Sequence, residues 1–422
     1  MSKQPPFFPA DILLPRVDNL TKWSVVACDQ YTSEPQYWQD TENLVGDAPS
    51  TLRMVFPELY LHDSGFEQRI ARINATMNDY LQRDIFRECP NSFIYVERTV
   101  TNGLVRRGIV GKIDLLAYDY TKGSDSLIRA TEGTVVERIP ARVNIRENAP
   151  LELPHVMLLI DDADDSVIGS VADNKDTLTP LYDFSLMQGG GAIRGYQVPA
   201  KMHDTIHNAL AALCEQQAFD NRYAISGRAP LLFAVGDGNH SLAAAKECYN
   251  RIAAGLSQED ALSHPARYAL AELVNLHDAS LEFEAIHRVV FDVNARQMLD
   301  ALFGYYDCAY GSHCGQAFGF VTAEHSGTVT IKNPKSNLAA GTLQAFLDNY
   351  VAHHGGRVDY IHGEDVLQRL AQQEGTVGFV LPCMKKSELF STVILDGALP
   401  RKTFSMGEAC EKRFYLEARK IR

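Results

Sequence analysis

Residues 231–241 read Leu231-Leu232-Phe233-Ala234-Val235-Gly236-Asp237-Gly238-Asn239-His240-Ser241. The first five are apolar, and a short apolar run of this kind is consistent with a buried strand. Two glycines follow, and we expect a helix to begin at about Asn239 and to fill 241–254. The stretch therefore predicts a buried strand that turns sharply into a helix.

Such a turn predicts an anion-binding site. Backbone N–H groups at a helix start point outward and carry partial positive charge. Gly236 and Gly238 let the backbone approach a ligand closely. Asp237 offers a carboxylate for a metal ion or for general-base catalysis, and His240 can donate to a phosphate oxygen or move a proton.

A structural alternative exists for the same turn. Asn239 or Ser241 would then cap the helix with its side chain, and the glycines would serve only a tight turn. Because polar loops after core strands often carry functional sites, we favour a binding or catalytic role for residues 236–241.

A second polar segment reads Ile128-Arg129-Ala130-Thr131-Glu132-Gly133-Thr134-Val135-Val136-Glu137-Arg138. Arg129 and Arg138 can each bind phosphate or carboxylate oxygens through two N–H groups. Thr131 adds a hydroxyl, and Glu132 adds a possible base. A solvated surface hairpin of mixed charge explains the pattern equally well, so both interpretations stay open.

Other polar stretches are weaker candidates. The loop 29–34 is either a substrate loop or a series of turns, and the histidines near 277 and 287 are more often structural. Residues 401–407 precede a possible helix start near 408, or belong to a basic tail. The chain has no P-loop and no G-x-G-x-x-G after a strand, so the usual nucleotide fingerprints are missing.

Composition narrows the class of protein. The 422 residues carry a net charge of −13, which disfavours nucleic acid as a partner because that affinity comes from Lys and Arg. No apolar segment has the length that a membrane span needs, and the N-terminus does not resemble a signal peptide. The eight cysteines include no C-x-x-C pair, which predicts core thiols in a reducing compartment. We therefore expect a cytoplasmic protein with no membrane partner.

The remaining patterns predict a mixture of hairpins and strand–helix units, hence an α+β fold with mixed sheets. Residues 1–62 are expected to form an irregular wrap, and Asn102-Gly103 a hairpin turn. Strands are expected at 93–96, 104–115, 155–160, 268–274, 317–322, 327–332 and 377–381, and helices at 66–84, 203–216, 296–304 and 341–353. Three regions are expected: 1–150 (α+β), 151–290 (a core containing the 236–241 turn) and 291–422 (α+β).

The chain resembles, nearly end to end, the bacterial family called domain of unknown function 1015 (DUF1015). The matching segments are Val26-Ala27-Cys28-Asp29-Gln30-Tyr31-Thr32-Ser33, Gly46-Asp47-Ala48-Pro49-Ser50-Thr51, Arg129-Ala130-Thr131-Glu132-Gly133-Thr134, Gly236-Asp237-Gly238-Asn239-His240-Ser241-Leu242-Ala243 and Arg401-Lys402-Thr403-Phe404-Ser405-Met406-Gly407-Glu408. The Asp-Gly-x-His segment is similar to the Asp-Gly-His-His-Arg turn of free serine kinases. The resemblance implies a ParB/sulfiredoxin-like kinase core at 151–290, with additional α+β structure around it.

In those kinases the turn binds the donor's phosphates, and a glutamate elsewhere activates the serine hydroxyl. Asp237, Gly238 and His240 match the turn, whereas Asn239 replaces its first His and Ser241 replaces its Arg. One phosphate ligand is therefore missing, and an arginine from residues 128–138 is expected to supply it.

The resemblance and the residues together predict a free L-serine kinase that forms O-phospho-L-serine, with Mg²⁺ and with pyrophosphate rather than a nucleotide as donor. The expected phosphate-binding residues are Gly236, Gly238, Asn239, His240, Ser241, Arg129, Thr131 and Arg138. The expected catalytic residues are Glu132 (base), Asp237 (metal or donor end) and His240, with Glu137 and Glu34 as other possible bases. Two alternatives remain: a phosphatase-like hydrolase of a small phosphorylated metabolite, and a ParB-like nucleotide-binding regulator.

Overall fold

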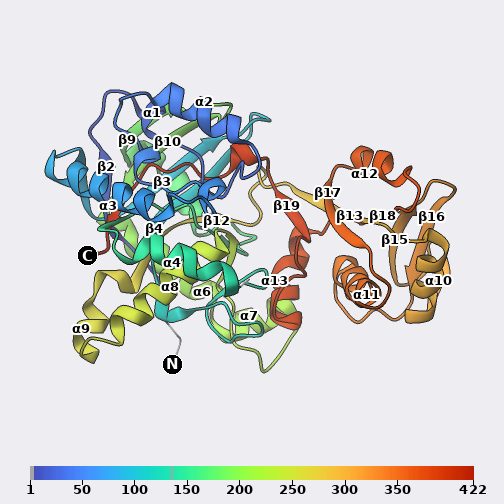
Figure 1. Cartoon of the computed structure of the whole chain (residues 1–422). Helices are drawn as coiled ribbons and strands as arrows, with labels where there is room; N and C mark the ends of the chain where they lie inside the picture. The colour runs from blue at the N-terminus through green and yellow to red at the C-terminus, as the bar shows by residue number, and fades with distance from the viewer. Residues whose placement is uncertain (1–3, 135) are drawn as a thin grey trace. The chain divides into compact units, whose positions relative to one another are not determined.

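The computed structural model describes residues 4–134 and 136–422, which form two compact units (Figure 1). Unit 1 comprises the residues up to Leu281 together with Glu408–Arg422, and unit 2 comprises Glu282–Gly407. The chain thus leaves unit 1, builds unit 2 and returns. The three regions expected from the sequence, with boundaries at 150 and 290, stay a prediction.

A large mixed sheet forms the centre of unit 1. Its strands lie in the order β5-β6-β11-β8-β12-β4-β3-β10-β9, with β1 on β4 and β2 on β3. The strands are β1 (Phe7–Phe8), β2 (Ala10–Pro15), β3 (Phe86–Thr99), β4 (Val105–Asp114), β5 (Tyr118–Asp119), β6 (Ile128–Ala130), β8 (Met157–Ile160), β9 (Thr179–Ser185), β10 (Ala192–Val198), β11 (Phe233–Asp237) and β12 (Tyr268–Asn275). A separate pair joins β7 (Leu151–Glu152) to β20 (Arg419–Lys420).

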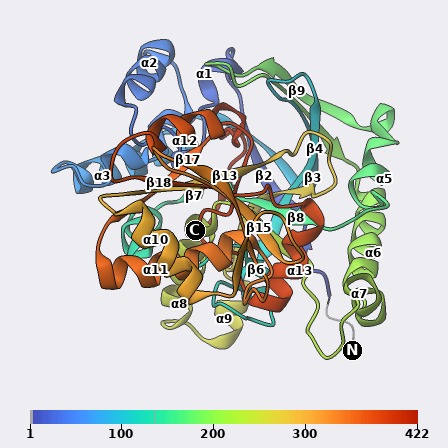
Figure 2. The ribbon, with the colours of Figure 1, turned by 90° about the vertical axis from the view of Figure 1, so that its right-hand side faces the viewer.

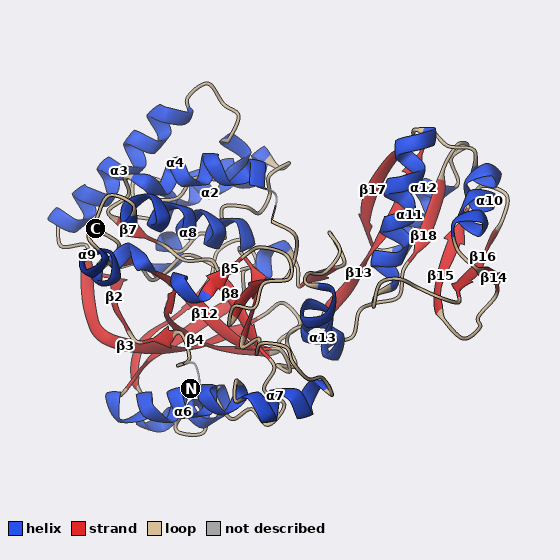
Figure 3. Ribbon diagram, turned by 90° about the horizontal axis from the view of Figure 1, so that it is seen from below, coloured by secondary structure: helices blue, strands red, loops and turns tan. Residues whose placement is uncertain are grey.

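Helices cover both faces of this sheet. Figure 3 shows α6 and α7 on one face, and α3, α4 and α8 on the other. The helices are α1 (Leu20–Trp23), α2 (Pro35–Val45), α3 (Phe66–Gln82), α4 (Ile139–Glu147), α5 (Ile168–Ala172), α6 (His203–Leu213), α7 (Gln216–Tyr223), α8 (Asn239–Ala253) and α9 (Gln258–Ser263). Small side chains of α8, Ala243 and Ala244, pack against Ile139 and Val143 of α4. This packing fixes the start of α8 beside the segment that follows β6.

Most of the expected elements are present in unit 1, and the mixed α+β class is confirmed. Three expectations need correction. Residues 1–62 are more regular than expected, because β1, β2, α1 and α2 lie there. Residues 128–138 do not form a surface hairpin: β6 is a buried strand, and the chain continues into a 3-10 turn (Val136–Arg138) and α4. The expected helix 203–216 is split into α6 and α7.

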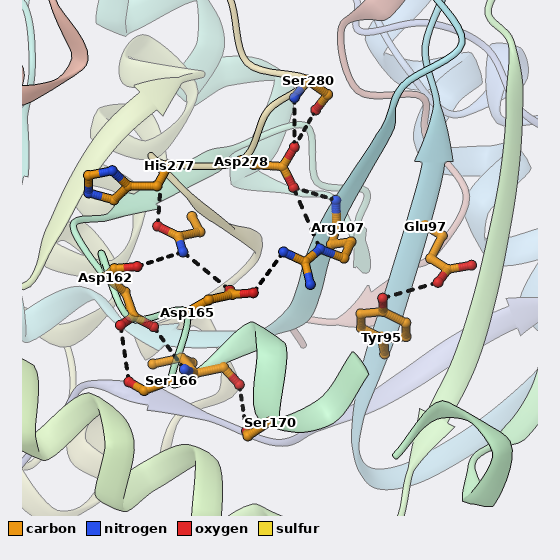
Figure 4. Close-up of polar contacts among 12 residues, drawn as sticks. Tyr95, Glu97, Arg107, Asp162, Asp165, Ser166, Ser170, His277, Asp278 and Ser280 are labelled. Carbon is orange, nitrogen blue, oxygen red and sulfur yellow. Dashed lines mark hydrogen bonds and ion pairs between the residues drawn. The ribbon is translucent and has the colours of Figure 1, made fainter. Parts of the chain in front are cut away.

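The acidic run 161–165 is held by hydrogen bonds to neighbouring strands (Figure 4). The carboxylate of Asp162 accepts the backbone N–H of Val167 at 2.8 Å, just before α5. Asp165 accepts from the Arg107 guanidinium on β4 at 2.7 Å, and Asn275 at the end of β12 donates to the backbone oxygen of Asp162 at 2.8 Å. The polar residues around Asn275 therefore tie a loop to the sheet.

Unit 2 is a smaller α+β unit (Figure 2). Its strands lie in the order β14-β16-β15-β18-β13-β17, with β19 on β13. They are β13 (Phe283–Phe291), β14 (Cys308–Tyr310), β15 (Gln316–Val321), β16 (Ser326–Ile331), β17 (Arg357–His362), β18 (Val377–Val380) and β19 (Phe404–Met406). The helices are α10 (Ala295–Tyr305), α11 (Ala339–His354), α12 (Glu364–Ala371) and α13 (Lys386–Asp396). Residues after Gly407 do not begin a long helix, since only a 3-10 turn (Ala409–Glu411) follows. In the described part of the chain, no helix combines the length and the apolar character needed to cross a membrane.

Candidate functional site

The two polar segments singled out in the sequence meet at one edge of the unit 1 sheet. Strands β6 and β11 are parallel neighbours, with Ala130 opposite Val235, so the residues that follow both strands emerge side by side. The Thr131 hydroxyl donates to the Val235 carbonyl at 2.7 Å and fixes this junction. Glu132 and Asp237 each follow the aligned pair by two residues, so the chain brings both residues to this end of the two strands.

The turn into α8 is built on Gly238. Its φ is +80°, in the left-handed region, and a Cβ there would lie 3.1 Å from the Cα of Val156. Gly238 is the N-cap of α8, and no described side chain caps the helix. The alternative in which Asn239 or Ser241 caps the helix is therefore wrong. Helix α8 therefore begins at Asn239 without a side-chain cap, and anion binding at this turn stays a prediction.

A hydrogen-bonded chain adjoins this turn. Ser241 Oγ lies 3.0 Å from His155 Nε2, and His155 Nδ1 lies 2.7 Å from the Tyr415 hydroxyl. The backbone N–H of Cys28 donates to the same hydroxyl at 3.2 Å. Because Nε2 also faces the carboxylate of Asp29 at 3.8 Å, we infer that neutral His155 carries its proton on Nε2 and accepts the Tyr415 hydroxyl at Nδ1. In this tautomer His155 donates to Ser241 and does not act as its base.

Asp29 adds a carboxylate next to His155. Its Oδ2 lies 3.8 Å from His155 Nε2. Burial alone raises the pKa of Asp29, but the electrostatic interaction with His155, the hydrogen bond from Gln30 and the charge of Lys412 together lower the pKa below its ordinary value. Asp29 is therefore ionised at neutral pH.

The last segment of unit 1 brings a cation to the turn. Lys412 Nζ lies 3.3 Å from Asp237 Oδ2. The neighbouring Arg413 is buried and pairs with Glu272 on β12 and with Glu417, the latter at 2.5 Å. These buried pairs fasten the segment to the sheet, so Lys412 is held close to the turn before α8.

His240 lies in a cationic environment and is itself uncharged. Its pKa is lowered to about 4 by burial first, and then by the charges of Arg142 and Arg138. At neutral pH His240 is thus a neutral hydrogen-bonding group. Arg142 also pairs with Glu58, whose pKa is raised because burial outweighs that pairing. Positive charge near the turn therefore comes from Arg138, Arg142 and Lys412.

Arg129 is not brought to the turn. Its guanidinium donates to the carbonyl oxygens of Ser126 at 2.8 Å and Ala229 at 2.8 Å. Both carbonyls precede the strands β6 and β11, whereas the turn follows them. In this position Arg129 stabilises the entry to the two strands, and Arg138 is the arginine of this segment that reaches the electrostatic surroundings of His240.

The turn also has donor atoms that fit Mg²⁺. Mg²⁺ is usually held by one or two protein oxygens together with substrate phosphates and water. Asp237 supplies a carboxylate, and Asn239 Oδ1 is buried without a hydrogen-bond partner among the described residues. Nowhere in the described residues do three or more His, Cys, Asp or Glu side chains form a metal-binding group. This donor set fits an ion that arrives together with a phosphate ligand.

Comparison with known families agrees with the resemblance in sequence. The family described as "Protein of unknown function (DUF1015)" matches residues 11–350. The chain belongs to the DUF1015 family. A search of curated proteins gave no match for this DUF1015 protein.

Several solved structures are similar to the DUF1015 chain at low identity. A free serine kinase in complex with AMP has 9% identity and a TM-score of 0.37, covering 72% of this chain and 93% of its own. A conserved hypothetical protein from Pyrococcus furiosus has 8% identity and a TM-score of 0.35, covering 72% and 97%. A C-terminally truncated SbnI from Staphylococcus aureus has 9% identity and a TM-score of 0.37, covering 73% and 87%. Values this low assign no ligand or reaction to this chain.

Sequence reasoning missed several residues of the site. His155 was expected only as the start of a strand, and Lys412 was not among the candidates. Glu58 and Tyr415 carried no recognisable pattern. Asp29 was a weak candidate in the sequence. The only signal that pointed to it was that its segment, residues 26–33, carries the family resemblance.

Proposed function

We propose that this DUF1015 protein is a small-molecule phosphotransferase, with L-serine as the acceptor and pyrophosphate as the donor. The observation that carries the proposal is the uncapped start of α8 on a left-handed glycine, flanked by Lys412 and by carboxylates on two adjacent strand ends. Phosphoryl transfer depends mainly on positioning and on charge neutralisation, and this edge supplies both.

The roles follow from position. The Gly238 amide already donates to Asp237 Oδ1 at 2.9 Å, so the amides of residues 239–241 and the cations Arg138, Arg142 and Lys412 would hold the donor. Asp237 and Asn239 would hold Mg²⁺, which neutralises charge on the phosphates when bound. In the transfer, the serine oxygen bonds to the terminal phosphorus, the bond from that phosphorus to the bridging oxygen breaks, and phosphate leaves. The serine proton passes to a carboxylate, for which we propose Glu132.

The direct test is to incubate purified protein with L-serine, Mg²⁺ and either pyrophosphate, ADP or ATP, and to measure phosphoserine. We expect phosphoserine with pyrophosphate, and none in excess chelator. Phosphate release without phosphoserine would support the hydrolase instead. Retention on a DNA column at moderate salt, with neither product, would support the regulator.

Two variants test the roles. Glu132→Gln should fold normally and lower turnover by ~10²–10⁴, because a base that acts only in the transition state contributes to rate and not to binding. Asp237→Asn should also fold normally and lower turnover, because it weakens the hold on Mg²⁺. Asp237→Asn should also change the Mg²⁺ concentration that gives half-maximal rate. Asp29→Asn is the matched comparison, since Asp29 is a second ionised carboxylate nearby. If it loses turnover while Glu132→Gln keeps it, the base is Asp29.

A further inference from the structure

A cavity of about 140 Å³ lies next to the candidate site within unit 1. Ser241 of the turn lines it, together with Leu242 and Ala245 of the first turns of α8. The cavity is therefore continuous with the residues that we assign to phosphate binding.

One wall of the cavity is polar and connected by hydrogen bonds. We call it the polar wall: it consists of Ser241, His155, Tyr415, Cys28, Glu58 and Arg142. The link between its two ends is the backbone N–H of Glu58, which donates to the Cys28 carbonyl at 2.8 Å. Another polar contact in the lining, between Arg146 and Glu152, is an ion pair at 2.5 Å.

Most of the remaining lining is apolar. It comprises Met54, Val55, Phe56, Leu61, Met77, Ile145, Ala149, Leu151, Leu153, Pro154, Val156, Leu242, Ala244, Ala245, Ala269 and Leu270. Water needs two to four polar partners, and the apolar residues away from the polar wall offer none. A volume of this size beside an apolar lining favours an apolar group.

An unsatisfied donor marks the polar end. Arg142 Nε is buried and has no hydrogen-bond partner among the described residues, although the rest of its guanidinium is bonded to Glu58 and to the Arg138 carbonyl. Buried donors of this kind are rare and call for an acceptor. An oxygen atom of a ligand in the cavity would supply it.

We propose that this cavity admits a second class of phosphoryl acceptor besides L-serine, namely small alcohols with an apolar substituent larger than that of serine. The hydroxyl end lies against the polar wall, between Ser241 and Arg142, and the apolar substituent fills the cavity. L-Serine would occupy the polar wall and leave the apolar part empty. The identity of the ligand as acceptor rests on the proposed function, whereas the cavity itself is a binding site independently of it.

Binding of simple alcohols tests the proposal without turnover. The probes are ethanol, 2-methylpropan-1-ol, benzyl alcohol and L-serine, titrated by saturation-transfer NMR. Each buried methylene strengthens binding by about fourfold, so 2-methylpropan-1-ol should bind about 15-fold tighter than ethanol. Equal affinity of all four probes would overturn the proposal.

Two lining variants locate the binding. Ala149→Leu shrinks the cavity and should weaken benzyl alcohol by at least tenfold while leaving ethanol unchanged. Leu153→Ala enlarges it and should keep or strengthen benzyl alcohol, and it guards against a folding defect in the first variant. Unchanged benzyl alcohol affinity in both variants would overturn the proposal.

A parallel transfer assay separates the two ideas. If phosphoserine forms and the larger alcohols neither bind nor react, the proposed function stands and the cavity assignment fails. If the alcohols bind with the expected order and no phosphate is transferred to any acceptor, the cavity is a ligand site and the phosphotransferase proposal fails.

Discussion

Removing the hydroxyl of Tyr415 should destabilise unit 1 through two buried groups at once. In Tyr415→Phe the ring remains, and its edge-to-face contact with His155 (5.5 Å between centroids, 87°) is kept. The backbone N–H of Cys28 and Nδ1 of His155 both lose their partner. Each unsatisfied buried group costs about 1–3 kcal/mol, and water entering from the adjoining cavity offsets part of this. We expect a loss of about 2–4 kcal/mol in the free energy of unfolding.

Urea unfolding followed by tryptophan fluorescence measures this loss of stability in unit 1. Both tryptophans, Trp23 and Trp38, lie in unit 1, and the Trp23 indole donates to the Leu416 carbonyl at 3.1 Å. The urea midpoint should fall by about 1 M, for a dependence of about 3 kcal/mol per M.

A second tyrosine provides the matched control. The Tyr118 hydroxyl is buried in unit 1 and has no hydrogen-bond partner among the described residues, and the residue is 1% exposed. Tyr118→Phe removes the same atom without leaving a partner behind, so stability should stay the same or rise by up to about 1 kcal/mol. Equal effects of Tyr415→Phe and Tyr118→Phe would refute the role of the hydrogen-bonded chain. ¹⁵N NMR of His155 gives an independent check, since the neutral imidazole ring of the wild type should carry its proton on Nε2.

Three further predictions concern the turn and its neighbours. The pKa of His240 is about 4 in the folded chain and higher in the unfolded chain, so the unfolded chain binds a proton first as pH falls. The free energy of unfolding should therefore decrease between pH 6.5 and pH 4. The urea midpoint of His240→Gln should depend less on pH than that of the wild type. Arg129→Met should lower the free energy of unfolding by about 1–3 kcal/mol, because two backbone carbonyls lose their hydrogen-bond donor. Pyrophosphate binding, measured by calorimetry, should stay unchanged. Weaker binding would mean that Arg129 contacts the phosphate after all. Gly238 and Gly123 both have a φ near +80°, and an alanine at either position would lower the free energy of unfolding by about 1–2 kcal/mol. Only Gly238→Ala adds a contact with Val156, so only this variant should abolish pyrophosphate binding. Loss of binding in both variants would point to a general folding defect.

Local patterns predicted the fold well where periodicity and turn chemistry agree. The apolar face of α3, with Ile70, Ile73 and Met77 buried, gave the helix almost to its ends. The strand–glycine–helix pattern at 236–241 gave both β11 and α8. Helix α2 was missed because its sequence has many polar residues and buries only a few side chains, and aromatic residues before it suggested irregular structure.

The site was harder to predict because its parts are distant in sequence. Asp237 and the Thr131 segment were recognised, since each follows a buried strand and has a composition suited to binding. Their proximity depends on the parallel pairing of β6 with β11, which no local pattern specifies. Arg129 was misjudged because an arginine in a buried strand looks the same in sequence whether its guanidinium reaches a ligand or backbone carbonyls. His155 and Lys412 meet the turn only through tertiary packing.

The return of the chain to unit 1 after unit 2 has a consequence for synthesis on the ribosome. Lys412 and Tyr415 are translated only after the 126 residues of unit 2, residues 282–407. At about 5–20 residues per second, this takes about 6–25 s. During that interval residues 1–281 are already synthesised, but His155 lacks its hydrogen bond with Tyr415 and Glu272 lacks its ion pair with Arg413. A nascent chain thus acquires the turn before α8 first, and completes the candidate site around that turn last.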